Sequence, residues 1–243
     1  MRLAGGAALA LIGATAVRPA EAGYQAGYVA QFQGANLSNS GFIPPDMGGA
    51  VGNGYVLQML NGAVSTYATS GTLVGSRQSL NAFWSGAGLG TAIGGTSVSD
   101  PRVIFDPSSG HWFASSISTQ GTNNNILVAV SRTSDPTQGF VGYAIPAAGN
   151  NFADFPTLGV NNSAVTIGTN NFTSSTGSLV GSSVYSISKS ALIDSIGSAQ
   201  PPSVTRFDNT SGVGFTPQAV SNLTGTGTTT TLLSSNTATT FNV

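Results

Sequence analysis

The sequence predicts an all-β fold, arranged as a β-propeller of four-stranded blades. Short runs of β-branched and aromatic residues alternate with Gly, Asn, Ser and Asp-Pro segments, which is the pattern of strands and tight turns. Only 6% of the residues are charged, too few for the solvated faces of long helices. Aspartates also recur 54 residues apart, at Asp46, Asp100 and Asp154, each at the start of a group of strand-like runs. A recurrence of roughly 40–50 residues with four strands in each unit is typical of propeller blades.

The composition excludes several classes of protein. A nucleic-acid-binding domain needs clustered Lys and Arg, whereas this chain has seven in total and a formal net charge of −1. A hydrophobic content of 40% can bury a core, which argues against intrinsic disorder. The chain has no Cys, so disulfides and cysteine metal sites are excluded, and the single His111 cannot form a His-rich zinc site.

The N-terminus has the pattern of an export signal. Met1-Arg2 supplies a positive charge, residues 3–17 form an uncharged run, and Ala20-Glu21-Ala22 matches a cleavage site. As a helix this run would be about 22 Å long, shorter than the roughly 30 Å hydrocarbon core of a membrane. We therefore predict a signal peptide over residues 1–22 and a mature domain over residues 23–243, with no later membrane span. The mature protein is expected to be secreted, periplasmic or attached to the cell surface.

Three groups of predicted strands follow in order along the mature domain. Most runs have four to six residues, which is too short for helices. The predicted strands cover residues 50–51, 55–60, 63–67 and 73–74 in the first group, 102–105, 112–118, 126–131 and 140–145 in the second, and 158–160, 164–168, 184–188 and 204–207 in the third. Phe215–Val220 is similar to the other group starts but lacks the acid. Helix signals are nearly absent, and the best candidate is residues 189–196, ending at Gly197.

This count gives about three to four blades, whereas closed propellers typically have four to eight. A strand over residues 24–34 could help to close the ring. The last residues, 237–243, have the pattern of an interrupted strand. We therefore expect an incomplete ring, truncated at the C-terminus, whose unpaired strand edges have few charges to protect them against aggregation.

Four segments carry a resemblance to a known group of proteins: PPDMGGAVG, SDPRVIFDPSSGHWFASS, ILVAVSRTSDPTQGF and FADFPTLGVNNSAVTIGTNNF. Together, within residues 42–220, they resemble large exported bacterial β-propeller proteins that are loosely sialidase-like. Asp106–Trp112 looks like a relaxed Asp-box, which in that family is a fold element of the outer rim and implies architecture without catalysis. Asp100-Pro101-Arg102-Val103 is similar to innermost-strand motifs of five-bladed glycoside hydrolases, whose catalytic carboxylates come from successive blades.

The three recurring aspartates are the main candidates for a functional site. If Asp46, Asp100 and Asp154 each begin an innermost strand, their carboxylates meet at one mouth of a central channel. Three interpretations stay open: turns into the strands, a site for a cation such as Ca²⁺, or the acid and base of an inverting glycosidase. The mature domain contains no Glu, which counts against the glycosidase. Arg102 lies two residues after Asp100 and is expected on the same side, where it could bind a substrate carboxylate or pair with an Asp.

The remaining candidates favour structural roles. His111 has no nucleophile or relay partner in the sequence, so we interpret it as a residue beside a turn, next to a Trp112 packed between sheets. Asp106 and Asp135 each lie in an Asp-Pro turn. Residues 86–90, GAGLG, lack the flanking strand, helix and downstream acid of a dinucleotide-binding loop.

These observations favour an exported, propeller-like binding or cell-surface interaction module, with a glycan or another cell-surface group as its ligand. The alternative is a carbohydrate-active hydrolase that uses Asp46, Asp100 and Asp154, with Arg102 orienting the substrate. A third hypothesis is a non-functional fragment of a longer propeller protein.

Overall fold

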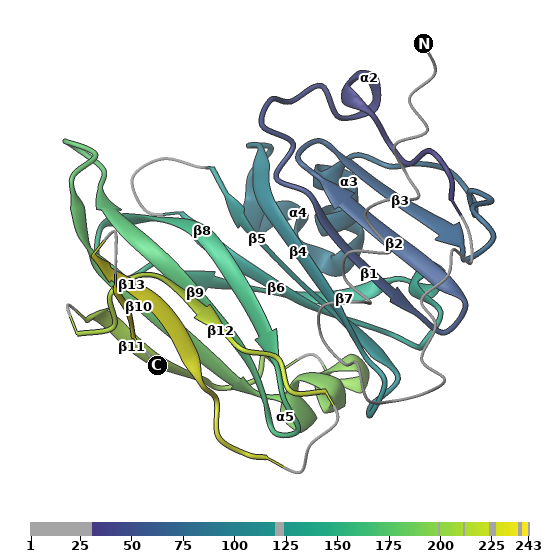
Figure 1. Cartoon of the computed structure of the whole chain (residues 1–243). Coiled ribbons are helices and arrows are strands. Elements are labelled where there is room, and N and C mark those ends of the chain that lie inside the picture. The colour runs from purple at the N-terminus through teal and green to yellow at the C-terminus, as the bar shows by residue number, and fades with distance from the viewer. Residues whose placement is uncertain are drawn as a thin grey trace, which may run out of the picture. The chain divides into compact units, whose positions relative to one another are not determined.

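Four antiparallel sheets follow one another along the chain (Figure 1). This computed structural model describes residues 31–119, 124–198, 200–210, 212–223, 227–237 and 240–242, and residues 34–243 form one compact unit. The fold is mostly β, with 49% strand and 15% helix. The predicted signal peptide and most of the strand expected over residues 24–34 lie outside the described residues. In the described part of the chain, no helix is long and apolar enough to cross a membrane.

Each sheet is built from strands that are consecutive in the sequence. Sheet 1 contains β1 (Gly48–Gly52), β2 (Tyr55–Leu60) and β3 (Ala63–Ala68), and sheet 2 contains β4 (Val98–Asp106), β5 (His111–Ser118), β6 (Asn125–Ser131) and β7 (Phe140–Pro146). Sheet 3 contains β8 (Asn151–Val160), β9 (Ala164–Thr173), β10 (Leu179–Ser188) and β11 (Val204–Thr210). Sheet 4 contains β12 (Phe215–Ala219), β13 (Leu232–Thr237) and β14 (Thr240–Asn242).

The strand predictions are confirmed except at two places. Residues 73–74 do not form a strand, because the segment after β3 meets it only at two isolated bridges, Tyr67 to Leu73 and Val64 to Gln78. Gly75, which has a positive φ of 68°, lies between these two bridges and turns the chain away from the ladder. The predicted run 215–220 is one residue longer than β12. Four strands are therefore described in sheets 2 and 3, and three in sheets 1 and 4.

One helix occurs at the predicted place, and other helices occur in segments for which the sequence predicts no helix. α5 (Lys189–Asp194) and a 3₁₀ turn, η3 (Ser195–Gly197), confirm the helix predicted over residues 189–196. The expectation that helices are otherwise nearly absent was wrong, because residues 80–93 form α3 (Leu80–Trp84), a π-helical turn η1 (Ser85–Leu89) and α4 (Gly90–Ile93). The glycine-rich segment 86–90 lies inside these helical turns, which kink at Gly88 with φ of 96°. Short helical turns also occur at α2 (Leu37–Ser40) and η2 (Pro136–Gln138).

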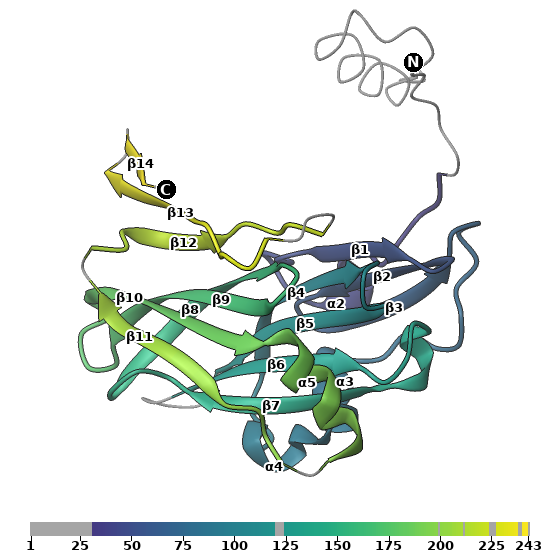
Figure 2. The ribbon, with the colours of Figure 1, turned by 90° about the horizontal axis from the view of Figure 1, so that it is seen from below.

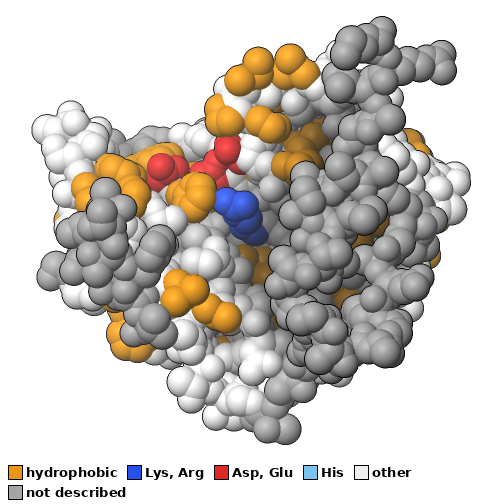
Figure 3. Space-filling view, in the orientation of Figure 1, with side chains coloured by type: hydrophobic (Ala, Val, Ile, Leu, Met, Phe, Trp, Pro, Cys, Tyr) orange, Lys and Arg blue, Asp and Glu red, His pale blue; other side chains and the backbone are white. Residues whose placement is uncertain are grey.

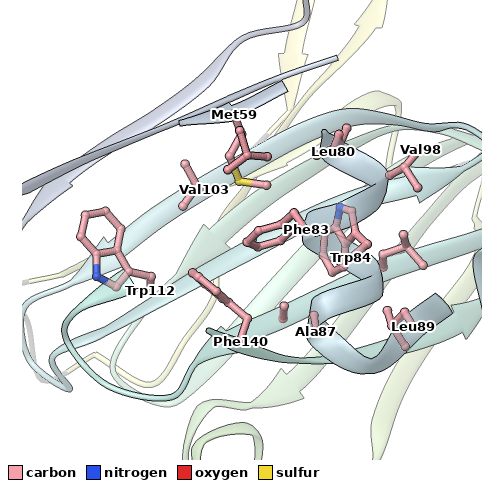
Figure 4. Close-up of a cluster of buried hydrophobic side chains, with 14 of the residues drawn as sticks. Met59, Leu80, Phe83, Trp84, Ala87, Leu89, Val98, Val103, Trp112 and Phe140 are labelled. Atoms are coloured by element: carbon pink, nitrogen blue, oxygen red, sulfur yellow. The ribbon is translucent and has the colours of Figure 1, made fainter. Parts of the chain in front are cut away.

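Sheet 2 is the middle layer of the core. β5 and β6 are buried on both faces, since alternate residues of a strand point to opposite sides. Leu127 and Ala129 pack toward sheet 1, in a cluster with α3 and Trp112. Ile126, Val128 and Val130 pack toward sheet 3 in a second cluster. Figure 4 shows the first cluster, in which Phe83 and Trp84 from the helical segment lie among side chains of the strands.

The first strands of successive sheets are in contact: β1 with β4, β4 with β8, and β8 with β12, which also packs across β9 and β10. Figure 2 shows β12 lying along the strands of sheet 3 and β1 lying next to β4. Glycines permit this approach, because a Cβ on Gly48 would lie 2.8 Å from the Pro101 carbonyl oxygen and a Cβ on Gly159 would lie 2.5 Å from Ala219. Gly48 and Pro101 both lie near the start of their strands, and Gly159 and Ala219 both lie near the end of theirs, so the strands of each pair run in the same direction.

Candidate functional site

The four first strands share an unusual backbone feature where they begin. Asp46, Asp100, Phe155 and Thr216 all have positive φ, between 40° and 56°, although none of them is Gly. In β4, β8 and β12 a register shift accompanies this residue, and regular pairing resumes two positions later. Such backbone is strained for residues with a side chain, and it persists only where surrounding contacts hold it.

This feature corrects the repeat that the sequence suggested. Asp46 and Asp100 occupy the same position at the start of their strands. In sheet 3 that position belongs to Phe155, so Asp154 lies one residue earlier, opposite Asn170 of β9. The equal spacing of 54 residues therefore does not correspond to three equivalent positions. The three aspartates nevertheless lie near the starts of β1, β4 and β8.

Asp46 and Asp100 are joined by a buried asparagine. Asn61, in the turn after β2, is 6% exposed. Its side-chain amide donates to Asp46 Oδ2 at 2.6 Å, and its Oδ1 accepts the Asp100 backbone N–H at 2.9 Å. These bonds fix two strand starts from different sheets and take up part of the hydrogen-bonding capacity of Asp46.

Both carboxylate oxygens of Asp100 accept hydrogen bonds within the protein. Ser99 donates its hydroxyl to Oδ1 at 2.8 Å, and the Phe155 backbone N–H donates to Oδ2 at 3.3 Å. Burial raises the pKa of Asp100 above its ordinary value of 3.8, and the negative charges of Asp154 and Asp46 raise this pKa further, while the two hydrogen bonds act in the opposite direction. The Asp100 carboxylate therefore holds the backbone at the start of β8, and its own pKa is raised.

Asp154 and Arg102 differ from Asp46 and Asp100 in their hydrogen bonding to the described residues. Within the described residues, the Asp154 carboxylate and the Arg102 guanidinium have no hydrogen bond or ion pair with a protein group. The Arg102 guanidinium instead lies over the Phe155 ring, 5.1 Å from its centroid. Within the described residues, Arg102 forms no ion pair with an Asp. We call Asp46, Asp100, Asp154, Arg102 and Phe155 the aspartate cluster.

Phe155 of the aspartate cluster is partly exposed, and so are two hydrophobic residues that are close to Asp46 in the sequence. Phe155 is 39% exposed, Met47 is 62% exposed and Ile43 is 82% exposed. Figure 3 shows acidic and basic side chains adjoining one another on this face, with hydrophobic side chains beside them. The cluster thus brings hydrogen-bond acceptors, a guanidinium and an aromatic ring together near the starts of three strands.

No metal centre is evident in the described part of the chain, where no group of three or more His, Cys, Asp or Glu side chains is arranged to hold an ion. The possible cation at Asp46, Asp100 and Asp154 therefore stays a prediction from the sequence. Carboxylates in this setting can accept hydrogen bonds from a ligand, and Asp100 can exchange a proton near its raised pKa.

The other candidates lie away from the aspartate cluster. Asp106 ends β4, opposite to its start, and forms a buried ion pair with Lys189 Nζ at 2.8 Å. His111 begins β5, and its Nδ1 bonds the Ser131 carbonyl at 2.8 Å. Asp135 caps η2 through the Thr137 N–H. These contacts support the structural functions predicted for the three residues.

Sequence reasoning missed the asparagines that hold the strand starts. Asn170, in β9, occupies the ladder position that corresponds to Asn61, and its Oδ1 accepts the Thr216 N–H at 2.7 Å. In an Asn-rich chain neither residue is distinguishable by composition. The X-Pro pairs at Asp100, Phe155 and Thr216 were a usable signal, because all three strained residues precede a proline.

No protein-family model, curated protein or solved structure matches this chain.

Proposed function

We propose that the mature domain is an exported, β-propeller-like binding module and that the aspartate cluster is its ligand site. The propeller arrangement is supported by four consecutive antiparallel sheets whose first strands are in contact in chain order. In such an arrangement the first strands line a common axis, and their starts surround one opening. The cluster lies at that end.

The ligand that fits this site best is a glycan. Sugars present hydroxyl donors that uncommitted carboxylates accept, and their C–H faces pack on exposed aromatic rings. Asp154 supplies free acceptor oxygens, Phe155 supplies an exposed ring, and Arg102 supplies donors for a hydroxyl or a sugar carboxylate. The Asp154 carboxylate is the observation that carries the proposal, because it has no hydrogen bond or ion pair with the described residues, whereas a group needed only for the fold would be bonded within it.

Binding of a glycan array by the purified protein tests this function. Asp154→Asn should weaken binding of any retained glycan at least tenfold, whereas Asp194→Asn should leave it unchanged, because Asp194 is an exposed residue of α5. Both variants are expected to remain folded, since the Asp154 carboxylate has no hydrogen bond to the described residues. A parent protein that retains no glycan, or an Asp154→Asn variant that binds as the parent does, would argue against the site.

A glycoside hydrolase is the second candidate, favoured by the pKa of Asp100. Partial burial and the charges of two further carboxylates raise the pKa of Asp100, which is the direction that a general acid requires, and Asp46 or Asp154 would act as the base. Release of reducing sugars from a broad glycan panel tests this reaction. Asp100→Asn should abolish release while Asp194→Asn retains it, and a parent protein without activity on the panel removes this candidate.

A further inference from the structure

A separate cavity of about 480 Å³ opens between sheets 1 and 2, and none of its lining residues belongs to the aspartate cluster. One wall is formed by β2 and β3 with the segment after β3, and the other by α3, η1, η2 and the start of β7. Its volume lies within the roughly 300–1,000 Å³ typical of small-molecule sites.

The floor of this cavity is apolar and partly aromatic. Leu57, Val64, Phe83 and Phe140 line it, and all four are at most 5% exposed. The rings of Phe83 and Phe140 stand edge to face, 4.8 Å apart, and Figure 4 shows the two side chains approaching each other between the helix and the strand. A ligand's aromatic ring can contact the small parts of these two rings that reach the cavity, because aromatic groups favour edge-to-face contact.

The rim supplies hydrogen-bonding groups without charge. No Asp, Glu, Lys, Arg or His is among the described residues that line the cavity. The side chains of Thr66 and Gln78 line it, and neither has a hydrogen bond to the described residues. A charged ligand would lose its hydration here without gaining a counter-charge.

We propose that this cavity binds an uncharged small molecule that carries an aromatic ring and one hydrogen-bonding group. The ring packs against Phe83 and Phe140, and the polar group faces Thr66 and Gln78 at the rim. This site is independent of the glycan site, because it uses other residues, other strands and a ligand of a different class.

The neutral fluorescent amine N-phenyl-1-naphthylamine is a suitable probe, since its emission rises in an apolar site. The parent protein should bind one equivalent saturably, with an affinity that does not change between low and high salt. Gly86→Leu should weaken binding at least tenfold, because Gly86 lines the cavity and a Cβ there meets nothing within 4 Å. Gly197→Leu is the matched control, as its Cβ also meets open space but Gly197 does not line the cavity.

Binding lost in Gly86→Leu and retained in Gly197→Leu, with both variants folded by circular dichroism, supports the site. If Gly86→Leu does not fold, Val74→Phe places a ring in the same space from the opposite wall and should have the same effect. Absence of saturable binding by the parent overturns the proposal, and so does equal binding by the parent and a folded cavity-filling variant. Binding that persists in these variants would be surface adsorption to exposed apolar side chains.

Discussion

Among single residues, the buried pair of Asp106 and Lys189 connects two parts of the chain that are 83 residues apart. Asp106 is 1% exposed at its side chain and Lys189 is 7% exposed. Burial alone would raise the pKa of Asp106, but hydrogen bonds from Lys189, Ser109 and Ser108 outweigh it and hold that pKa below 3.8. The turn at Asp106 was predictable from its Asp-Pro sequence, whereas its partner on α5 was not, since nothing local in the sequence relates the two segments.

We expect Asp106→Asn to lower the free energy of unfolding by about 3–5 kcal/mol at pH 7, because it leaves the Lys189 ammonium buried without a counter-charge. A lowered carboxyl pKa contributes stability that is present above pH 3.8 and is lost as the pH falls through the folded-state pKa. The difference between variant and parent should therefore narrow in acid. Urea unfolding at pH 7 and at pH 3 measures both effects.

The double variant Asp106→Asn with Lys189→Met is the control, because it removes both charges and should recover much of the loss. Equal stability of parent and single variant at pH 7 would contradict the expected contribution of the pair.

Between elements, asparagine side chains hold the start of one sheet against the next. Asn61 accepts the Asp100 N–H, and Asn170 accepts the Thr216 N–H at the equivalent place. At the start of β8 the acceptor is an aspartate and not an asparagine, because the Asp100 carboxylate of sheet 2 accepts the Phe155 N–H. Each strained backbone residue of β4, β8 and β12 thus has its N–H bonded to a side chain of the preceding sheet, which explains how the positive φ is maintained.

Asn170→Ala should accelerate hydrogen exchange at the Thr216 amide, because that N–H loses its acceptor and Thr216 Oγ1 loses the Asn170 amide. The loss of stability is expected to be about 1–3 kcal/mol, the usual cost of an unsatisfied buried polar group. Exchange of a peptide covering residues 214–220, followed by mass spectrometry, provides the measurement. Asn162→Ala, at an exposed turn position, should not alter this peptide, and unchanged exchange in Asn170→Ala would show that another group holds the start of β12.

The elements themselves differ in how well the sequence predicts them. β6 was predictable because a continuous apolar run of its length fits only a strand buried on both faces. The helical segment from residue 80 was missed, although Leu80, Phe83, Trp84 and Ala87 have the i, i+3, i+4, i+7 spacing of a buried helix face. Its glycines have low helix propensity, but packing against sheet 2 stabilises these turns.

For the whole molecule, the order of the sheets was predictable from the strand runs, but the contacts between sheets were not. The offset of Asp154 depends on a single residue in a register shift, and the 54-residue spacing concealed it. The contact of Arg102 with Phe155 depends on how sheet 3 approaches sheet 2. Such features arise from tertiary packing and leave no local pattern.

The two hydrophobic clusters share sheet 2, and this predicts that sheets 1, 2 and 3 unfold together. Both tryptophans, Trp84 and Trp112, lie in the cluster between sheets 1 and 2, whereas Ile187 of β10 lies in the cluster between sheets 2 and 3. Ile187→Ala should lower the stability by about 2–5 kcal/mol. In urea it should shift the tryptophan fluorescence transition and the circular dichroism transition by the same amount, since β5 and β6 contribute side chains to both clusters.

A fluorescence transition that stays in place while the circular dichroism transition moves would show that the sheets unfold independently. Aggregated or molten parent protein would favour the hypothesis of a non-functional fragment, because separate sheets would then lack a common core. A monodisperse protein with coincident transitions would count against that hypothesis, since the side chains on both faces of sheet 2 then act as one cooperative core.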